Sequence, residues 1–580
     1  MRQPGFSNNM STAHLDDRDQ GYQQCAGDDR LGKGAASAIA NGVHTMKVKI
    51  AATLLILGLV LLGWAEADAG ASDRILRFGV NVSKMGRLDP HFAAAAQDRA
   101  VADMVFNGLL RYQPGNAPRM EPDLAERIPE FKMHNGRQVW TVPLRKGVMF
   151  HSGPQSPAHE MTAEDVVFSF RKAAENSSSA YSGEYAGMTF EAVGDYTVII
   201  SLDRPLSTVL FLPKIANYGG GFIVSKRAVE AAGMDGFQRH PVGTGPFRFA
   251  EYIDGEKVAL TAHENYFRGS PRLAGIEIHF APDDAQRAKD LVSDRLDVII
   301  ASGETGWIDR MKNEKDIVIN PHGVGELAMV LFNTKMAPLD DIRVRQALAH
   351  ALDKDALMTA MDPTFVGGPA YSPVPALLLP GGLHRQEAAQ LGLIVETDLA
   401  KAKGLLASAG YPDGFTLKLV SSEKRIYHLY YSILRDNLAR IGIICDIEFV
   451  PHAEMHRRIR QEPQAIVVYA AWRPNADVYL TRFFHSDSIV VTGARPDTNF
   501  SHYDKVDNLI EAARSEINPD RQISLWIQAQ IRILNDVAVY PIMTTNQCYL
   551  RRASVQYGHP LVSSMALYPQ FTEKTRFIVK

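Results

Sequence analysis

Residues 397–420 read T-D-L-A-K-A-K-G-L-L-A-S-A-G-Y-P-D-G-F-T-L-K-L-V, and they hold the transition from helix to strand that decides the fold class. Thr397 opens a predicted helix. Its inward-facing side chains are apolar at helical spacing: Ala402, Leu405, Leu406 and Ala409. Gly410 ends the helix in a left-handed conformation, and Pro412 prevents its continuation. A strand, a helix and a strand follow at 415–420, 427–441 and 443–450. This alternation predicts an open, mixed α/β lobe.

The first half of the chain shows the same alternation. We expect a strand at 75–82 and a helix at 100–110. The alternating apolar residues of 140–144 and 148–150 predict a hairpin. A second hairpin is predicted around Asp254-Gly255, because this dipeptide favours a tight turn.

Helix starts are marked by capping residues. Thr162-Ala163-Glu164-Asp165 resembles a capping box, in which the Thr162 hydroxyl accepts a hydrogen bond from the amide three residues later. Asp340 and Asp341 are placed to cap a helix whose apolar stripe runs from Val344 to Leu352. Residues 501–535 read as mostly helical.

An export signal is predicted at 46–69. Lys47 and Lys49 form its basic start, and residues 50–64 are an apolar run too short to span a bilayer comfortably. An A-x-A cleavage site follows within 65–69. Because the polar residues 1–45 precede the signal, we expect Met46 to be the true start and residues 1–45 to be a non-native or disordered extension. The alternative is a retained signal anchor with a disordered cytoplasmic tail.

The composition is that of an ordinary globular protein, with 22% charged residues, 46% hydrophobic residues and a formal charge of −3. We therefore expect no nucleic-acid partner. The residues after position 69 are too many for one core and suit two or three domains.

No catalytic constellation is visible. Gly243-Thr244-Gly245-Pro246 lacks the Lys-Ser/Thr pair of a phosphate loop and is interpreted as a structural turn. His452 and His456 have a spacing that could bind metal on one helical face, but a solvated helix face explains them as well, and we expect no metal and no cofactor. Cys445 and Cys548 could form a disulfide; we favour buried thiols.

Several longer blocks occur in one order along the chain. They are 88–91 with 107–110, 144–151 with 162–166, 241–247 with 265–267, 332–335 with 340–347, and 400–415. In this order they resemble the extracytoplasmic solute-binding proteins of family 5, the dipeptide- and oligopeptide-binding group of ABC importers. The resemblance covers essentially all of the chain after the signal.

The resemblance implies an α/β protein with the type II periplasmic-binding-protein fold, in which two lobes close on a ligand about a hinge. It places lobe I at 70–95, 220–325 and 540–580, an inserted subdomain at 96–219, and lobe II at 326–539. The hinge crossovers are expected near Gly325 and Val539.

The resemblance also implies site residues in lobe II. The segment containing Arg425 and Tyr427 is similar to the one in which dipeptide binders place an arginine for the ligand carboxylate. A guanidinium suits this role because it donates two parallel hydrogen bonds, and Tyr427 could pack or donate beside it. The alternative is a surface arginine at a helix start.

Peptide binders of the family carry an aspartate after a Gly-Trp pair for the ligand's amino group. The matching segment here, 471–480, is shorter, with Arg473 and Asn475 where acids are expected. Asp477 could be a displaced anchor or could cap the next helix. Trp472 could line the cleft or belong to the core. In lobe I, the family implies ligand contacts at Ser83, Lys84 and Met85.

We therefore predict a monomeric, non-enzymatic, periplasmic substrate-binding component of an ABC importer. It captures a peptide or similar small organic solute and delivers it to an inner-membrane permease. The alternatives are a haem- or metal-chelate-binding member of the family, for which His452 and His456 would be the visible support, a secreted hydrolase, and a periplasmic receptor or chaperone.

The first testable prediction concerns export. We expect the exported form to begin at residue 68 or 70, because signal peptidase cuts after small residues at the end of an apolar run. N-terminal sequencing of the periplasmic protein measures this directly. Recovery of residues 1–45 in a membrane fraction would contradict both the cleavage and the start at Met46.

Overall fold

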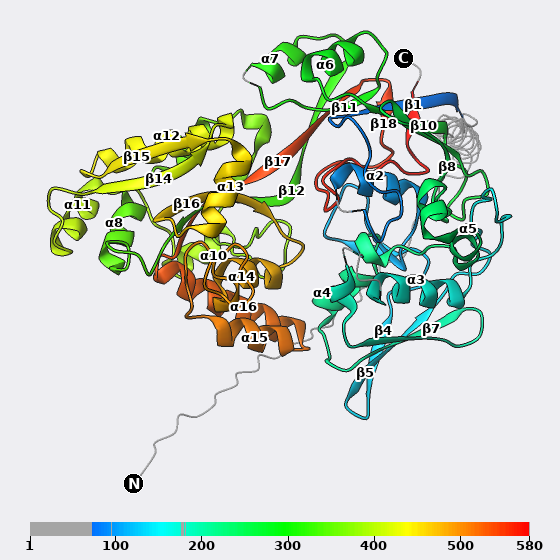
Figure 1. The fold of residues 1–580 in the computed structure, drawn as a ribbon, viewed down its shortest axis with the longest axis horizontal. Coiled ribbons are helices and arrows are strands. Elements are labelled where there is room, and N and C mark those ends of the chain that lie inside the picture. The colour runs from blue at the N-terminus through cyan, green and yellow to red at the C-terminus, as the bar shows by residue number, and fades with distance from the viewer. Residues whose placement is uncertain (1–71, 94, 176–178, 180, 305, 579–580) are drawn as a thin grey trace, which may run out of the picture. The chain divides into compact units, whose positions relative to one another are not determined.

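Nine strands drawn from the whole chain form one mixed sheet, which organises the fold of this computed structural model (Figure 1). The order across the sheet is β16 (Ile466–Trp472), β12 (Ile317–Phe332), β17 (Val539–Arg552), β11 (Val298–Ile300), β1 (Ser72–Val80), β10 (Leu273–Phe280), β9 (Lys257–Ala262) and β8 (Phe247–Ile253). The ninth strand, β13 (Val366–Pro369), pairs with β17. Strand β1 is parallel to both of its neighbours, β10 and β11. Strand β12 is antiparallel to both of its neighbours, β16 and β17.

The structure describes residues 72–578 except 94, 176–178, 180 and 305. The predicted signal at 46–69 and the predicted extension at 1–45 lie outside these residues. Within the described residues, none of the helices has both the length and the apolar character needed to span a bilayer.

Two long antiparallel strands, β12 and β17, run through both lobes. Strand β12 has 16 residues and pairs with β17 from Ile317, opposite Arg552, to Leu331, opposite Val539. One end of the pair adjoins β11, and the other end adjoins β16. The register shifts between Gly323 and Glu326, where Gly325 has a φ of 72°, in the left-handed region that favours glycine. The predicted crossover near Gly325 falls at this bulge.

The remaining elements of the N-terminal half lie outside the nine-stranded sheet. They are α2 (Ala96–Val105), β2 (Leu110–Tyr112), β3 (Met120–Pro122), β4 (Glu130–His134), β5 (Arg137–Pro143), α3 (Ala163–Glu175), η1 (Ser182–Tyr185), β6 (Met188–Ala192), β7 (Thr197–Leu202), α4 (Thr208–Phe211), η2 (Leu212–Ile215), η3 (Gly219–Gly221), α5 (Lys226–Arg239), α6 (Asp284–Val292) and α7 (Trp307–Lys312). Strands β4, β5, β7 and β6 form a separate antiparallel sheet in that order.

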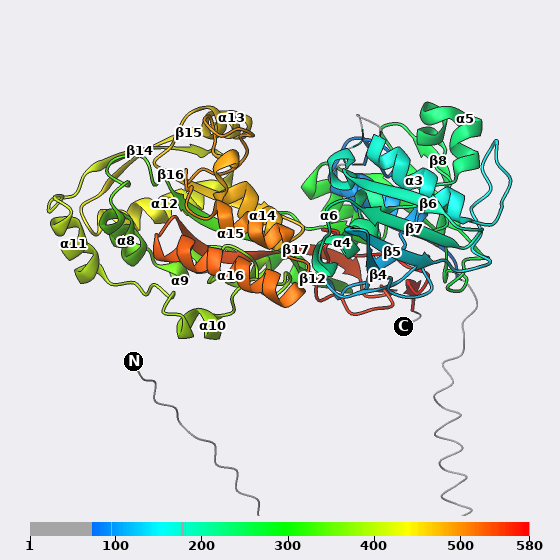
Figure 2. The ribbon, with the colours of Figure 1, turned by 90° about the horizontal axis from the view of Figure 1, so that it is seen from below.

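The C-terminal half contains most of the other helices. Its elements are α8 (Ile342–Ala351), α9 (Lys354–Thr359), η4 (Pro363–Phe365), α10 (Arg385–Gln390), α11 (Leu399–Ser408), β14 (Thr416–Ser422), α12 (Arg425–Ala439), β15 (Ile444–Val450), α13 (His452–Gln461), α14 (Ala476–Phe484), η5 (Ser486–Ser488), α15 (Asp507–Ser515), α16 (Pro519–Asn535), β18 (Val555–Gln556) and β19 (Arg576–Phe577). Helices α14, α15 and α16 pack together beside β17 (Figure 2).

Most of the predicted alternation is confirmed. Strand β14, helix α12 and the parallel strand β15 reproduce the strand, helix and strand expected after residue 415. The hairpin around Asp254-Gly255 is formed by β8 and β9. Cys445 and Cys548 are free and buried, as predicted.

The predicted hairpin between 140–144 and 148–150 is wrong. Strand β5 pairs with β4 and β7 instead. The chain does turn at Gly147, whose φ is 72°, but the Phe150 amide then donates to the carbonyl of His159. Both segments alternate because both are buried on one side, and burial alone does not determine which strand is the pairing partner.

Two helix starts are capped differently from the prediction. At α3 the Thr162 hydroxyl and amide both donate to the Asp165 carboxylate, at 3.3 and 3.0 Å, and the Asp165 amide donates to the Thr162 carbonyl. Helix α11 is capped by Asp398, whose carboxylate accepts from the Lys401 amide at 2.9 Å. At α11 the Asp398 carboxylate, a strong acceptor, takes the capping position expected for Thr397, whereas at α3 the Thr162 hydroxyl donates to Asp165 instead of accepting from its amide. Asp341 caps α8 as expected.

The Gly243–Pro246 segment is a structural turn against the end of α2. The Gly245 amide donates to the Val105 carbonyl at 2.8 Å. A Cβ at position 243 would lie 2.1 Å from that same oxygen, so only glycine fits. Close backbone packing therefore explains these glycines without a phosphate.

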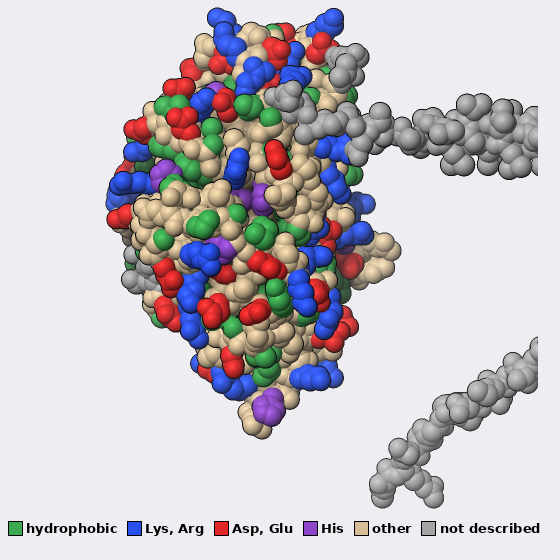
Figure 3. All heavy atoms as spheres, turned by 90° about the vertical axis from the view of Figure 1, so that its right-hand side faces the viewer, with side chains coloured by type: hydrophobic (Ala, Val, Ile, Leu, Met, Phe, Trp, Pro, Cys, Tyr) green, Lys and Arg blue, Asp and Glu red, His purple; other side chains and the backbone are tan. Residues whose placement is uncertain are grey.

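Acidic and basic side chains are interspersed on the face shown in Figure 3. They do not gather into a single basic stripe on this face, which agrees with the small formal charge of −3.

A buried ion pair joins α3 to the loop after β1. The Lys172 ammonium donates to both carboxylate oxygens of Asp89 at 2.7 Å and lies 3.1 Å from Nδ1 of His91. Lys172 is 9% exposed and Asp89 is 1% exposed. This pair is the main electrostatic contact between the two segments.

The second prediction concerns this pair. Lys172→Met keeps an apolar stem of similar length but leaves the Asp89 carboxylate buried without a cation, so we expect a loss of about 3–5 kcal/mol in folding free energy. Thermal and urea unfolding followed by circular dichroism measure the loss. The matched control is Lys312→Met, which removes the exposed Lys312–Asp309 pair and should leave unfolding nearly unchanged. Equal effects of the two variants would contradict the prediction.

Candidate ligand-binding site

A cavity of about 450 Å³ lies beside the bulge of the two long strands. Its volume falls within the range of roughly 300–1,000 Å³ that is usual for small-molecule sites. The lining comes from the segment before and within α7, the end of α9 and η4, the start of α12, and both long strands: Gly303, Glu304, Gly306, Asp309, Glu326, Ala360, Met361, Asp362, Pro363, Phe365, Arg425, Ile426, Leu429, Thr545, Asn546 and Gln547. Residues of predicted lobe I and predicted lobe II therefore share one cavity.

A second cavity, of about 140 Å³, lies at the carboxyl ends of the parallel strands β1 and β11. Val80 and Asn81 line it at the end of β1, and Ile300 lines it at the end of β11. Ligands of open α/β sheets bind outside this edge of the strands. Gln547 of β17 lines both cavities, so the two are neighbouring parts of one region.

Arg425 is the first residue of α12 and reaches across the 450 Å³ cavity to the lobe I segment. Its Nη1 donates to the Gly303 carbonyl at 3.2 Å. The side chain is exposed, and no acidic residue among those the structure describes forms an ion pair with it. The guanidinium therefore keeps most of its donors for a ligand.

Glu326 places a carboxylate in the same cavity. Its Oε2 accepts a hydrogen bond from the Thr545 hydroxyl at 2.6 Å, and the two residues are directly opposite in the β12–β17 ladder. Glu326 is half-buried, and within the described part of the chain it has no basic partner in an ion pair. Its negative charge adds to burial, the larger cause, in raising the pKa of Tyr427, Tyr430 and Tyr479.

Two other acids of the cavity are already paired. Glu304 contacts Arg310 at 3.2 Å, and Asp309 contacts Lys312 at 2.9 Å. Asp362 accepts from the Thr364 amide at 2.9 Å, so Arg425, Glu326 and Asp362 are the charged residues of the lining whose hydrogen-bond partners are neutral groups.

Tyr427 lies in an aromatic cluster beside the cavity. Its ring centroid is 5.4 Å from that of His452 and 6.5 Å from that of His456. The ring of Tyr469 extends the cluster at 5.9 Å from His456. Tyr427 thus packs against histidines and does not itself line the 450 Å³ cavity, so its role beside a ligand carboxylate stays a prediction.

The two histidines belong to a directed chain of hydrogen bonds. Arg460 can only donate, so Nδ1 of His456, 3.0 Å away, accepts. Nε2 of His456 must then donate to Nε2 of His452 at 3.1 Å, and Nδ1 of His452 donates to the Ser422 hydroxyl at 3.0 Å. This network assigns both rings as neutral. The pKa of His456 is lowered to about 4, first by burial and then by the neighbouring His452, Arg460 and Lys424.

The segment from Trp472 to Asp477 lies at the end of β16 and the start of α14. The Trp472 ring packs at 5.9 Å from that of Tyr218. Arg473 donates to the Trp472 carbonyl and to the Thr498 hydroxyl, and its guanidinium lies over Phe483. Asn475 caps α14 by accepting from the Val478 amide at 2.9 Å. None of these residues lines the 450 Å³ cavity.

Asp477 faces α15 rather than the cavity. Its Oδ2 is 3.3 Å from Nε of Arg514. Burial raises the pKa of Asp477, and the charge of Arg514 partly offsets this. The carboxylate is thus engaged inside lobe II.

The predicted lobe I contacts follow β1. Ser83 and Lys84 are exposed, and Met85 is 5% exposed. The 140 Å³ cavity is lined instead by Asn81, two residues earlier. The nearby Gly86 and Leu88 line a different cavity, of about 430 Å³, with Phe249 and Tyr252.

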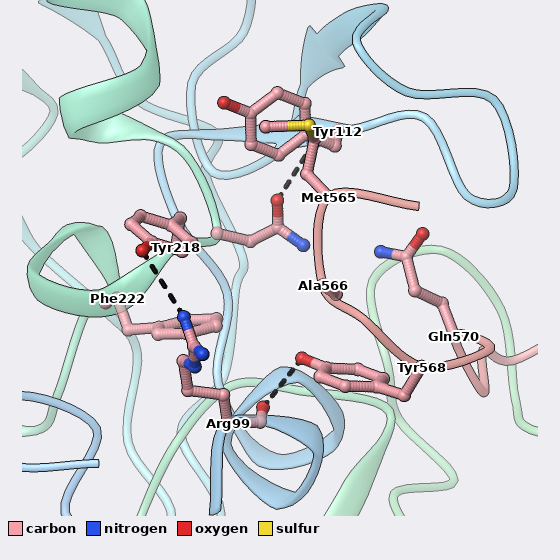
Figure 4. Close-up of a pocket in the computed structure, with 10 residues that line it drawn as sticks. Arg99, Tyr112, Tyr218, Phe222, Met565, Ala566, Tyr568 and Gln570 are labelled. Atoms are coloured by element: carbon pink, nitrogen blue, oxygen red, sulfur yellow. Dashed lines mark hydrogen bonds between the residues drawn. The ribbon is translucent and has the colours of Figure 1, made fainter. Parts of the chain in front are cut away.

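Figure 4 shows how Tyr218 is supported. Nη1 of Arg99 donates to the Tyr218 hydroxyl at 3.3 Å, and the Tyr568 hydroxyl donates to the Arg99 carbonyl at 2.9 Å. The space between these side chains is about 10 Å³, enough for about one water molecule. This cluster therefore positions the ring that meets Trp472 and leaves no room for a solute.

Sequence reasoning missed Glu326, Thr545 and Gln547. Glu326 follows Gly325 and precedes the apolar run of β12, a single acid whose position in the sequence resembles an exposed strand end. The one available signal is the Gly-Glu pair at the predicted crossover.

Comparisons with known proteins agree with this architecture. Residues 119–489 match the family described as "Bacterial extracellular solute-binding proteins, family 5 Middle". Because the match spans more than half of the chain, the protein belongs to this family, whose members are binding proteins with the type II periplasmic-binding-protein fold.

Three similar proteins illustrate the range of the family. The chain is 27% identical over 473 residues to "Heme-binding protein A" of Haemophilus influenzae, which covers 76% of this chain and 82% of the relative. It is 26% identical over 512 residues to the "Dipeptide-binding protein" of Escherichia coli, with 84% and 91% covered. A solved structure of the PBP/SBP MoaA in complex with mannopinic acid from A.tumefacien R10 is 35% identical, with a TM-score of 0.68, and covers 87% of this chain and 100% of that chain.

The third prediction concerns His456. Its pKa of about 4 in the folded protein is below the ordinary value of 6.5, so the unfolded chain binds the proton first as the pH falls. Folding stability should therefore decrease between about pH 6.5 and pH 4, and His456→Gln should remove part of this decrease. NMR titration of the His456 ring should show no midpoint above pH 5. A midpoint near 6.5 would contradict the hydrogen-bond chain described above.

Proposed function

We propose that this protein is the periplasmic substrate-binding component of an ABC importer, which captures a peptide or similar small organic solute between two lobes and delivers it to an inner-membrane permease. Capture needs a cavity that both lobes line, and the 450 Å³ cavity meets this requirement. We further propose that the protein acts as a monomer and performs no chemistry on the solute.

The observation that carries this proposal is the position of Arg425. The side chain comes from α12 in lobe II and contacts the Gly303 carbonyl of lobe I across the cavity. An anionic group of the solute can replace that carbonyl, because two parallel donors of a guanidinium match a carboxylate better than one carbonyl oxygen does. Arg425 would then hold the solute while the lobes enclose it.

The relatives support different solutes. One is named for haem, one for dipeptides, and one structure contains mannopinic acid. The groups in those names include carboxylates, which Arg425 suits. The names of the relatives therefore do not identify the solute. The charge of Arg425 supports a solute that carries a carboxylate or another anionic group.

Haem or metal-chelate capture is the second candidate, because His452 and His456 lie together and one relative is named for haem. Each ring nitrogen of the pair already has a hydrogen-bond partner. Among the described residues, no group of three or more His, Cys, Asp or Glu side chains is arranged to hold a metal ion. A metal would have to displace one of these hydrogen bonds, so the organic solute is favoured.

The fourth prediction tests Arg425. Arg425→Ala should leave the fold intact and weaken binding of an anionic solute by about 2–5 kcal/mol, because a charge pair enclosed by the lobes is lost. Calorimetry measures the affinity for the solute that native mass spectrometry finds bound to the purified protein. The matched control is Arg385→Ala, which removes an exposed arginine from the same first position of another helix, α10.

Equal affinities of wild type and Arg425→Ala would remove Arg425 from the site. A haem or metal chelate in the purified protein, with binding lost in His456→Gln, would favour the second candidate instead.

A further inference from the structure

We propose that Glu326 recognises a cationic group of the solute, so that the site selects molecules carrying both an anionic and a cationic group. This inference rests on the proposed capture of a solute in the 450 Å³ cavity. It assigns to β12 a role in specificity that the family resemblance had offered for Asp477, with a helix cap as the alternative.

The first support is the free hydrogen-bonding capacity of the Glu326 carboxylate. A carboxylate offers about four acceptor positions, and the Thr545 hydroxyl uses one of them, at Oε2. Thr545 is 6% exposed and Glu326 is half-buried, so the carboxylate is held on one side by the strand pair. The remaining acceptor positions can receive donors from a solute in the cavity.

The second support is the sign of the charge. A half-buried carboxylate gains most from a cation, since a charge-assisted hydrogen bond is roughly twice as strong as a neutral one. Within the described residues, no lysine, arginine or histidine forms an ion pair with Glu326. Asp362, whose carboxylate accepts from the Thr364 amide at 2.9 Å, adds further negative charge to the lining. The cavity therefore disfavours a solute that carries only negative charge.

The third support is that the alternative anchor is occupied. Asp477 contacts Arg514 at 3.3 Å and does not line the cavity. Asn475, its neighbour, caps α14. Oδ1 of Asp477 has no hydrogen-bond partner among the described residues, but this atom is buried and neither side chain lines the cavity that holds Arg425.

The fourth support is the apolar surface of the cavity that Arg425 and Glu326 also line. Met361, Phe365, Ile426 and Leu429 contribute apolar surface to the same cavity. A solute with charged ends and an apolar body would place its anionic group at Arg425 and its cationic group at Glu326. Its body would then pack against these side chains.

The experiment combines three variants with matched probes. The probes are a panel of dipeptides and betaines together with their N-acetyl or uncharged-amine analogues, plus simple dicarboxylates. Calorimetry and thermal shift are recorded for wild type, Glu326→Gln, Glu160→Gln and Asp477→Asn. Glu326→Gln keeps the shape and an acceptor for Thr545. Glu160→Gln is the matched control, because Glu160 is also half-buried and accepts from a hydroxyl, that of Tyr196 at 2.9 Å, but does not line the cavity.

We expect zwitterionic probes to bind wild type and to lose roughly 30-fold or more in affinity in Glu326→Gln, as expected for a lost enclosed charge pair. The N-acetyl analogues should bind weakly and should not be affected by Glu326→Gln. Glu160→Gln and Asp477→Asn should leave both affinities nearly unchanged, because neither residue lines the cavity. The losses from N-acetylation and from Glu326→Gln should be non-additive, which a merely structural role of Glu326 would not produce.

Equal binding of zwitterions to wild type and Glu326→Gln, or preferred binding of dicarboxylates, would overturn this inference. Native mass spectrometry of the purified protein separates its failure from that of the proposed function. A bound solute without a cationic group leaves capture intact and overturns the role of Glu326. If neither the panel nor any co-purified solute binds, both proposals fail.

Discussion

The pairing of β12 with β17 is the constraint on which the rest of the structure depends. The ladder extends from Ile317 to Leu331 on β12, so one pair of strands provides backbone hydrogen bonds along this whole length apart from two register shifts. Its registers are interrupted between Gly323 and Glu326, and again between Ala328 and Met329. A bulge bends a strand and redirects its side chains. The first interruption places Glu326 opposite Thr545 at the cavity, which links the geometry of the hinge to the chemistry of the site.

The local alternation of the fold could be predicted from the sequence, because it depends on neighbouring residues. The strand, helix and strand from Thr416 to Val450 follow from periodicity and from the glycine and proline around residue 411. The pairing partner of Trp140 could not be predicted, since burial gives the same alternation whichever strand lies beside it. The order of the nine-stranded sheet likewise depends on contacts between residues hundreds of positions apart.

The candidate site was only partly predictable for the same reason. The prediction of Arg425 as a site residue rested on the resemblance of its local segment to the family. The structure places Arg425 in the lining of the cavity. The ion pair of Asp477 with Arg514 could not be predicted from the sequence, because Arg514 lies on a separate helix. Glu326 was missed because a single acid within β12, just before the apolar residues 327–332, gives no periodic signal. Its environment is created by Thr545, which lies on the partner strand β17.

In the proposed site, Arg425 and Glu326 are suited to solute capture because each is held by a neutral partner. Arg425 contacts a carbonyl and Glu326 contacts a hydroxyl, so neither has to leave an ion pair before it meets a solute. If Arg425 and Glu326 formed an ion pair with each other, binding of a solute would cost the free energy of breaking that pair. This cost would add to the free energy of desolvating the solute's own charges. Holding the charges apart on rigid elements, a helix start and a paired strand, fixes the positions at which opposite charges are favoured. In the proposed site, the spacing of these positions would set specificity, and the apolar side chains of the lining would pack against the body of the solute.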